Sequence, residues 1–291
     1  MRLATLVAEP HRDSITPAER EKIIDGGGGR RRSSAAVRVA ATFGQSSPLT
    51  KIRPENAFYR EVAMDTKHDT MRSEELLKRG RESLRCIDFS NMSLELMKTN
   101  VGSDATFNLS RPVQKGGTID FFMSHSWHDD ADEKWKTIQR VAEDFKAKNK
   151  RYPTFWLDKT CIDQKNITDS LKVLPVYVMS SKKMLILCGP TYPSRLWCVW
   201  EIFTLFSFSL QEVATGKVVL EPFTTEESGL TQDSILNKLR GFEVANACCY
   251  DPNEEAKLKN VIGIIGTKVF NDRVQQLAKS VIDSRQKIRL G

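Results

Sequence analysis

Short apolar runs alternate, from residue 118 onward, with stretches whose apolar residues recur every three or four positions. This alternation of strand-like and helix-like segments is typical of a parallel sheet covered by helices. Residues 119–123, apolar apart from Asp120, predict a strand that is buried on both faces. Four more strands are predicted at 154–157, 184–187, 217–220 and 242–245. Right-handed crossovers make a doubly wound α/β sheet of about five strands the simplest topology.

Helical spacing is clearest directly after the first strand. The apolar positions there are Trp135, Ile138, Ala142 and Phe145. Asp130 and Glu133 precede all four and predict an N-terminal cap. A second helix is predicted at 195–209 with Ser194 as its cap, and it is apolar nearly all round, so we expect it to be buried. Further helices are predicted at 69–84, 167–179, 232–239, 254–265 and 271–285.

Charge and composition divide the chain into four parts. Residues 1–60 contain 11 Lys and Arg against 6 Asp and Glu, a net +5 of the chain's +7. A run of four glycines and a Ser/Ala-rich stretch without periodicity predict that this basic tail is disordered. We expect a mixed helical lead-in at 61–117, the α/β domain at 118–250, and C-terminal helices at 251–291 that pack on the domain or follow it.

The charge distribution also bears on partners. Residues after position 60 are nearly neutral, with 33 basic against 31 acidic side chains. Nucleic-acid binding by the folded part would need a concentrated basic face, so we expect none. The longest apolar run, 196–210, is shorter than the roughly 20 residues of a membrane span and contains Glu201. It predicts a buried helix, and no membrane span is expected.

The cysteines and histidines are not arranged as a metal site. Six cysteines are scattered through apolar segments, and no secretory signal precedes them. We interpret them as reduced thiols of a cytoplasmic protein. His125 and His128 lie three residues apart, but no second pair stands at zinc-binding spacing, so no metal is expected.

Functional side chains follow three predicted strands directly. In doubly wound sheets the ligand crevice lies beyond the carboxyl ends of the strands. The loop at 124–130 reads Ser-His-Ser-Trp-His-Asp-Asp, and that at 158–164 reads Asp-Lys-Thr-Cys-Ile-Asp-Gln. The third, at 189–194, leads into the helix that carries Trp197 and Glu201. These three loops are where we expect chemistry.

These segments resemble the signature motifs of Toll/interleukin receptor (TIR) domains. The motifs are an apolar strand followed by Ser-His-Ser-Trp, a strand followed by Asp and a long polar loop, and Ser-x-x-Trp-Cys-x-x-Glu opening a helix. The resemblance covers about 130 of the 291 residues. In detail, the motifs look more like those of TIR-like proteins of protists. It implies a flavodoxin-like fold, a role in signal transduction, and self-association or association with other TIR-like domains.

The resemblance also implies roles for particular residues. Glu201 would be the catalytic carboxylate of an NAD+ glycohydrolase, with NAD+ as substrate and no cofactor. The candidate substrate-binding residues are Ser124, His125, Ser126, Trp127, Trp156, Asp158, Lys159 and Trp197. The candidate interaction loop contains Cys161, Ile162, Asp163 and Gln164. Independently of the family, a carboxylate among Val199, Trp200 and Ile202 is costly unless it is paired or faces a cleft, which makes Glu201 a functional candidate.

One carboxylate is sufficient for this reaction. Ordinary glycosidases need an acid to protonate the leaving oxygen as well as a base or nucleophile. The nicotinamide of NAD+ is already cationic and departs neutral, so a single anion can stabilise the oxocarbenium-like transition state. The sequence leaves open whether linear or cyclic ADP-ribose would form. Cys198 is a weaker nucleophile candidate, because its motif contains no histidine base.

Other functions of similar sheets fit less well. A phosphorelay receiver needs an aspartate at the end of the third strand, where this chain has Cys188. No Gly-rich dinucleotide fingerprint or P-loop follows the first strand. The rival that stays open is a TIR-like scaffold without catalysis, which would act through the loop at 158–166.

Overall fold

The computed structural model describes residues 67–99, 103–163 and 172–290. The basic tail predicted at 1–60 lies outside these residues, as do Gln164 and the first part of the helix predicted at 167–179.

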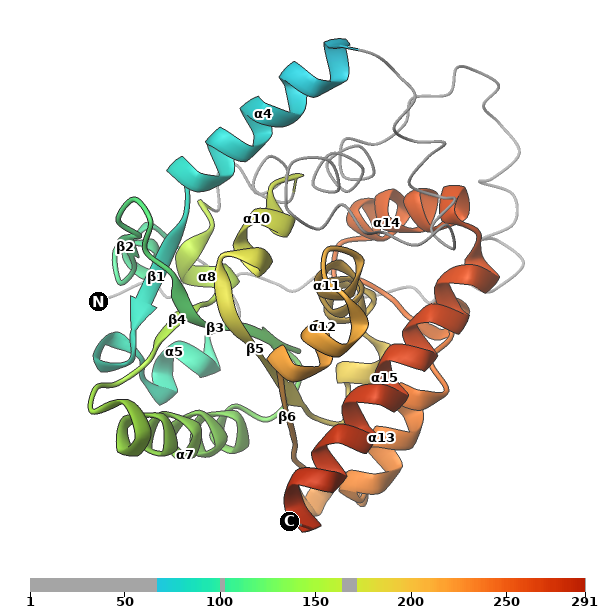
Figure 1. The fold of residues 1–291 in the computed structure, drawn as a ribbon. Helices are drawn as coiled ribbons and strands as arrows, with labels where there is room; N and C mark the ends of the chain where they lie inside the picture. The colour runs from blue at the N-terminus through green and yellow to red at the C-terminus, as the bar shows by residue number, and fades with distance from the viewer. Residues whose placement is uncertain (1–66, 100–102, 164–171, 291) are drawn as a thin grey trace, which may run out of the picture. The chain divides into compact units, whose positions relative to one another are not determined.

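Six strands form one mixed sheet in the order β2-β1-β4-β3-β5-β6 (Figure 1). The strands are β1 (Arg85–Asp88), β2 (Arg111–Pro112), β3 (Ile119–His125), β4 (Thr154–Trp156), β5 (Ser181–Cys188) and β6 (Val218–Pro222). Strands β4, β3, β5 and β6 are parallel, whereas β1 is antiparallel to both β4 and β2. The prediction of a wholly parallel sheet was therefore wrong. Strands β1 and β2, which precede residue 118 in the chain, extend the four parallel strands at the β4 edge.

The prediction of a strand at 242–245 was also wrong. This segment contains the 3-10 helix η4 (Val244–Asn246) and joins no named strand. The Val244 amide donates to the Asn271 side-chain carbonyl at 3.0 Å, and the Phe242 ring packs against Phe270. Side chains from a later helix therefore satisfy this backbone and cover its apolar residue, which a strand-like pattern does not reveal.

Strand β3 is the centre of the sheet, and all seven of its residues are buried. Its apolar side chains are divided between two cores, because successive strand residues point to opposite faces. Phe122 belongs to the larger core, and Phe121 and Met123 belong to the smaller one. The strand runs two residues further than predicted, so Ser124 and His125 are its last members and point to opposite faces.

Helices cover both faces of the sheet (Figure 1). The α-helices after the first lead-in helix, α4 (Lys67–Glu82), are α5 (Leu94–Lys98), α6 (Asp104–Phe107), α7 (Ala131–Asn149), α8 (Asp158–Cys161), α10 (Leu174–Met179), α11 (Leu196–Ser207), α12 (Gln211–Lys217), α13 (Gln232–Arg240), α14 (Pro252–Ile265) and α15 (Thr267–Leu290). Short 3-10 turns are η1 (Phe89–Asn91), η2 (Tyr192–Ser194) and η3 (Glu226–Ser228). Helix α7 packs on the smaller core, and α10, α11 and α15 pack on the larger one.

Helix α7 follows the prediction closely. It begins after Asp130, whose carboxylate accepts from the Glu133 amide at 2.8 Å. Its buried residues include Ile138 and Ala142, both in the predicted apolar stripe. Local capping and periodicity were sufficient here, because the helix needs only one apolar face to pack on the sheet.

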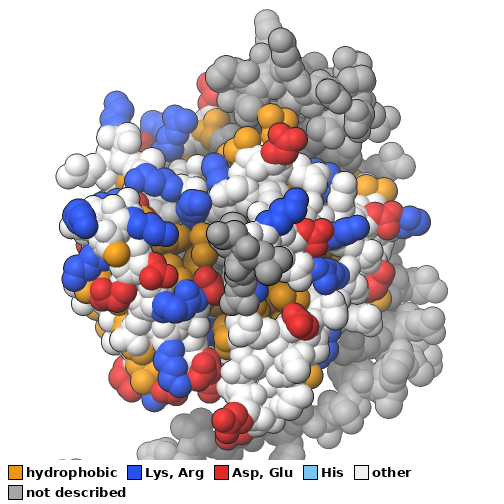
Figure 2. Space-filling model, turned by 60° about the horizontal axis from the view of Figure 1, so that its bottom comes forward, with side chains coloured by type: hydrophobic (Ala, Val, Ile, Leu, Met, Phe, Trp, Pro, Cys, Tyr) orange, Lys and Arg blue, Asp and Glu red, His pale blue; other side chains and the backbone are white. Residues whose placement is uncertain are grey.

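The surface carries both signs of charge. On the face in Figure 2, Lys and Arg side chains alternate with Asp and Glu. A groove of about 1080 Å³ lies on the α7 side of the sheet, and Phe121, Val141 and Phe223 are among its apolar lining residues. Glu201 does not line this groove. Among the described helices, none is both long and apolar enough to cross a bilayer.

Candidate functional site

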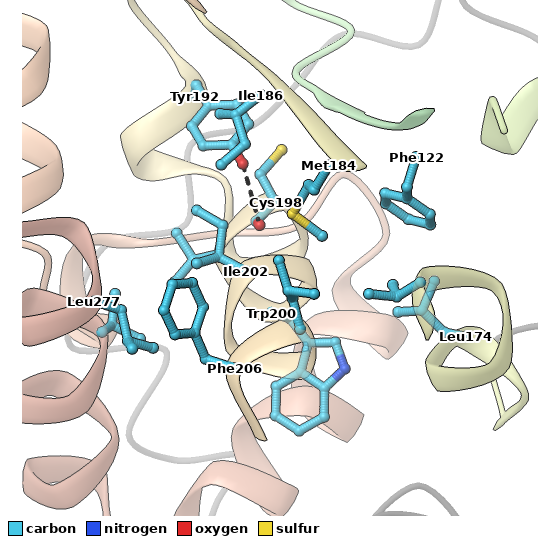
Figure 3. Packing of buried hydrophobic residues seen from close by; sticks show 14 of the residues in the cluster. Phe122, Leu174, Met184, Ile186, Tyr192, Cys198, Trp200, Ile202, Phe206 and Leu277 are labelled. Carbon is cyan, nitrogen blue, oxygen red and sulfur yellow. Dashed lines mark hydrogen bonds between the residues drawn. The ribbon is translucent and has the colours of Figure 1, made fainter. Parts of the chain in front are cut away.

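Glu201 lies in α11, a helix surrounded by apolar neighbours. Its side chains at Trp200, Ile202 and Phe206 point in different directions within the larger core (Figure 3), and the Trp200 ring stacks on Phe270 of α15. Burial of nearly the whole helix surface follows from its sequence, which has one charged residue among twelve. Glu201 itself is 5% exposed. A carboxyl group has thus been taken into the core of the domain.

The start of α11 is held by a distant segment rather than by the predicted cap. The Leu196 amide donates to the Cys248 carbonyl at 3.1 Å, and the Cys248 amide donates to the Ser194 carbonyl at 3.0 Å. The Ser194 hydroxyl donates to the Thr191 carbonyl instead of capping the helix. The prediction of Ser194 as N-cap was wrong, because a long-range backbone bridge replaces the side-chain cap.

Two buried hydroxyl groups connect Glu201 to the end of β3. Ser124 Oγ donates to Glu201 Oε2 at 2.5 Å and lies 2.7 Å from the Tyr192 hydroxyl. The Tyr192 hydroxyl also lies 3.4 Å from the carbonyl of Cys198, as the dashed line in Figure 3 shows. Ser124 and Tyr192 are fully buried. The residues form a continuous hydrogen-bonded chain between β3, η2 and α11.

The electrostatic surroundings of Glu201 disfavour its ionised form. Burial raises its pKa well above the usual range, the Ser124 hydrogen bond acts in the opposite direction, and the charge of Asp158 raises it further. Among the described residues, none of the ion pairs includes Glu201. The carboxyl group therefore does not line the groove on the α7 side and has no Arg or Lys partner among the described residues. Burial therefore favours the neutral form of the carboxyl group.

His125 points to the other face of the sheet. Its side chain is 1% exposed and packs edge-on against Trp127, with 4.2 Å between ring centroids. Within the described part of the chain, neither ring nitrogen has a hydrogen-bond partner, and Nε2 is 4.0 Å from Asp158 Oδ1. Burial, with the nearby charges of Lys134 and Lys159, lowers its pKa well below the usual value. These surroundings therefore favour the neutral imidazole.

Trp127 and Asp158 hold the loop ends after β3 and β4 together. The Trp127 indole N–H donates to Asp158 Oδ2 at 3.0 Å. The ammonium groups of Lys159 and Lys134 lie 4.9 and 5.6 Å from the Trp127 ring centroid. The indole N–H and part of the ring of Trp127 are therefore occupied by contacts within the protein. Less of the ring surface is left to stack on a ligand.

Lys134 and Lys159 donate hydrogen bonds to backbone carbonyls. Lys159 Nζ donates to the Leu96 carbonyl at 2.6 Å and to the Thr99 carbonyl, so it caps the C-terminal end of α5. Lys134 Nζ donates to the Ser126 carbonyl at 2.9 Å. Burial lowers the pKa of each ammonium group to about 8. Lys159, a predicted substrate ligand, has a structural role in this conformation.

The remaining predicted substrate residues lie apart. The Ser126 hydroxyl is 2.7 Å from the Thr191 hydroxyl, which links the first and third loops. Trp156 is 1% exposed and stacks on Phe122 with 4.4 Å between ring centroids, and its N–H has no partner. Trp197 is half-buried against the larger core. Only Ser124 among the eight predicted substrate residues bonds directly to Glu201.

The predicted interaction loop is largely internal where it is described. Residues 158–161 form helix α8, and Cys161 and Ile162 are buried in the larger core. Asp163 is partly exposed, and Gln164 lies outside the described residues. Among the described residues, no group of three or more His, Cys, Asp or Glu side chains could hold a metal ion.

Sequence reasoning missed two residues. Tyr192 stands in the loop that we expected to carry chemistry, but an aromatic ring after Gly-Pro-Thr gives no signal that its hydroxyl bonds to Ser124, the donor to Glu201. Asp129 was visible only as half of an acidic pair; its Oδ1 accepts from Thr191 and its Oδ2 is buried without a partner. Both roles depend on chain segments that meet only after folding.

The comparisons with known proteins add no relative. No protein-family model matches this chain, and no curated protein or solved structure does. A proposal about its function therefore rests on its own residues and their arrangement.

Proposed function

We propose that this chain is a TIR-like signalling protein with a flavodoxin-like domain, in which Glu201 is the catalytic carboxylate for hydrolysis of NAD+ to nicotinamide and ADP-ribose. The observation that carries the proposal is a buried Glu201 that has a single hydroxyl donor and no cation within ion-pair distance among the described residues. A fold without a use for such a group would gain stability by replacing it. Uncompensated carboxyl groups of this kind are concentrated at functional sites.

The position of Glu201 relative to the sheet supports the same proposal. Taken in chain order, the four parallel strands lie 2-1-3-4, the order of flavodoxin-like sheets. Ser124, the hydrogen-bond donor to Glu201, stands at the carboxyl end of β3, where ligands bind in such sheets. All the buried side-chain atoms without a partner among the described residues belong to His125, Asp129 and Trp156, at or just beyond the carboxyl ends of β3 and β4.

The chemistry requires Glu201 to become ionised. A carboxylate near the ribose stabilises the positive charge that develops as neutral nicotinamide leaves. The nicotinamide ring of NAD+ is itself cationic, so bound substrate would favour the carboxylate and bring the pKa of Glu201 down. Because Glu201 is 5% exposed, substrate entry also requires the loops around it to open. We therefore expect activity to rise with pH and to depend on the assembly state.

A non-catalytic scaffold is the second candidate. It would act by self-association or by binding other TIR-like domains. The observation in its favour is that Glu201 is closed off from solvent, while Lys159 and Trp127 are occupied by contacts within the chain. In this case Glu201 would be a neutral hydrogen-bonding residue of the core.

Nicotinamide release from NAD+ separates the two candidates. We would compare wild type with Glu201→Gln and Glu201→Ala, each in dilute solution and at crowded, assembly-promoting concentration, with Glu212→Gln on the neighbouring helix α12 as control. Glu212 is exposed and has no part in the site. Loss of at least about 100-fold in both Glu201 variants, with Glu212→Gln unchanged, is the expected result.

The opposite outcome is equally clear. If wild type, folded by circular dichroism and self-associated by light scattering, released no nicotinamide at either concentration, the scaffold proposal would replace the enzymatic one. Equal release by wild type and Glu201→Gln would assign the activity to another residue.

A further inference from the structure

The hydroxyl groups of Ser124 and Tyr192 form a chain that ends at the Glu201 carboxyl. The two oxygen–oxygen distances are 2.5 Å from Ser124 to Glu201 and 2.7 Å from Ser124 to Tyr192. The chain continues to the Cys198 carbonyl, 3.4 Å from the Tyr192 oxygen. Each hydroxyl group can donate one hydrogen bond and also accept, so the direction of the whole chain is free to reverse.

These hydrogen-bonded hydroxyl groups can satisfy the Glu201 carboxyl in either of its protonation states. With a carboxylate, Tyr192 donates to Ser124 and Ser124 donates to Glu201. With a carboxylic acid, Glu201 donates to Ser124, Ser124 donates to Tyr192, and Tyr192 donates to the Cys198 carbonyl. No heavy atom has to move between the two arrangements. The proton of Glu201 is exchanged with water, and the two hydroxyl groups keep their protons and only rotate.

Among the described residues, no positive charge lies within ion-pair distance to stabilise the carboxylate instead. The titratable groups that face the carboxyl are Tyr192 from η2, Cys198 from its own helix and Asp158 from α8, all of them acidic. The elements α10, α12 and α15 pack against α11 with apolar side chains such as Leu174, Ala214 and Leu277. His125 points to the other face of the sheet. The hydrogen bonds that the Glu201 carboxyl receives in this otherwise apolar part of the core therefore depend on the two hydroxyl groups.

We propose that Ser124 and Tyr192 are positioning residues that form a reversible hydrogen-bond relay, which allows Glu201 to exist as acid or carboxylate in one fixed geometry. The catalytic use of this relay rests on the proposed function, but the relay itself does not. It would hold the Glu201 carboxyl in one orientation both while the site is closed and when substrate makes it ionise.

The two relay residues should have opposite effects on Glu201. In Ser124→Ala the carboxylate loses its one hydrogen-bond donor, so the acid is favoured and the titration midpoint moves to higher pH. In Tyr192→Phe the carboxylate keeps its donor. In the acid form, however, the Ser124 hydroxyl is a buried donor without an acceptor, so the midpoint moves to lower pH. A merely structural role would not produce shifts of opposite sign.

The test is a carboxyl ¹³C NMR titration of the full chain labelled at glutamate, with the Glu201 signal assigned by its loss in Glu201→Gln. Tyr177→Phe is the matched control, because Tyr177 is a buried tyrosine of the same core whose hydroxyl lies 2.9 Å from Ser83. We expect no movement of the Glu201 midpoint in Tyr177→Phe. Ser124→Cys, a milder change with a weaker donor, should move the midpoint in the direction of Ser124→Ala and replaces it if the alanine variant does not fold.

Unchanged midpoints, or shifts in the same direction for Ser124 and Tyr192 variants, would overturn the relay. The titration needs no turnover, so it is independent of nicotinamide release. Opposite shifts without any release would leave the relay standing and remove the proposed enzyme function. Release without opposite shifts would leave the function standing and remove the relay.

Discussion

Two buried carboxyl groups lie toward opposite ends of the same domain and have opposite surroundings. Asp120, near the start of β3, receives hydrogen bonds from Arg151 at 2.6 and 2.8 Å, from Lys182 at 3.2 Å and from the Thr154 amide at 3.0 Å. Burial acts to raise its pKa, but these donors outweigh it and bring the pKa to about 2. Glu201 has one hydroxyl donor, and its pKa is raised well above the usual range.

The difference shows where the fold is stabilised and where it is not. At the start of β3 a buried charge is fully paired, which locks the ends of three strands together. At or beyond the carboxyl ends of β3 and β4, the described residues include a carboxyl group whose neutral form is favoured, an imidazole without a hydrogen-bond partner and an aspartate oxygen without one. Groups left in this state lower stability and persist where they serve another purpose.

The strongest test of this comparison is removal of the paired carboxyl group. Asp120→Ala should lower the free energy of unfolding by about 2–4 kcal/mol, because it leaves Lys182, Arg151 and the Thr154 amide without their acceptor. Urea unfolding measures this loss. Asp88→Ala is the control, since the Asp88–Arg111 pair is largely exposed and should change stability by about 1 kcal/mol or less. Equal losses in the two variants would contradict the contrast.

Replacement of the unpaired carboxyl should have the opposite sign and depend on pH. The folded pKa of Glu201 is raised above its unfolded value of 4.5, so wild type loses stability as pH rises above 4.5 and until the folded group has ionised. Glu201→Gln escapes this loss. Its advantage over wild type should be absent below pH 4.5 and grow above it, by no more than about 1.4 kcal/mol per pH unit.

Asp120 provides the reverse pH dependence. Its folded pKa is about 2 against an ordinary 3.8, so its contribution is complete above 3.8 and is lost as pH falls through 2. Urea midpoints measured from pH 3 to 8 for wild type and Glu201→Gln would show the Glu201 effect separately from this acid limb. A constant difference between the two proteins at every pH would refute the assignment of a buried neutral acid.

The smallest effect is expected at Lys159, which sharpens the distinction between ligand and structural residues. Lys159→Met should cost about 1 kcal/mol, because the C-terminal carbonyls of α5 lose their donor while the apolar part of the side chain is kept. Hydrogen exchange should accelerate in α5 and not in α13. If Lys159→Met instead abolished nicotinamide release without affecting α5, Lys159 would be a substrate ligand as first predicted.

Much of the fold could be read from local pattern. The start of α7 at the Asp130 cap and its apolar stripe follow from one side-chain oxygen and from apolar spacing, and the burial of β3 follows from its composition. These features depend on residues close in the chain. The 3-10 turn at 244–246 and the bridge between Arg195 and Cys248 do not, because their hydrogen-bond partners come from distant segments.

The same division holds for the candidate site. The sequence alone determined that Glu201 lies on a buried helix, since its neighbours are apolar on every side of the helix. Only the tertiary structure decided that Ser124 and Tyr192 meet its carboxyl, that no described cation does, and that His125 faces away. Hydrogen bonds and ion pairs act over a few ångströms, so which polar groups come within that distance is determined by how strands and loops pack and not by their order in the chain.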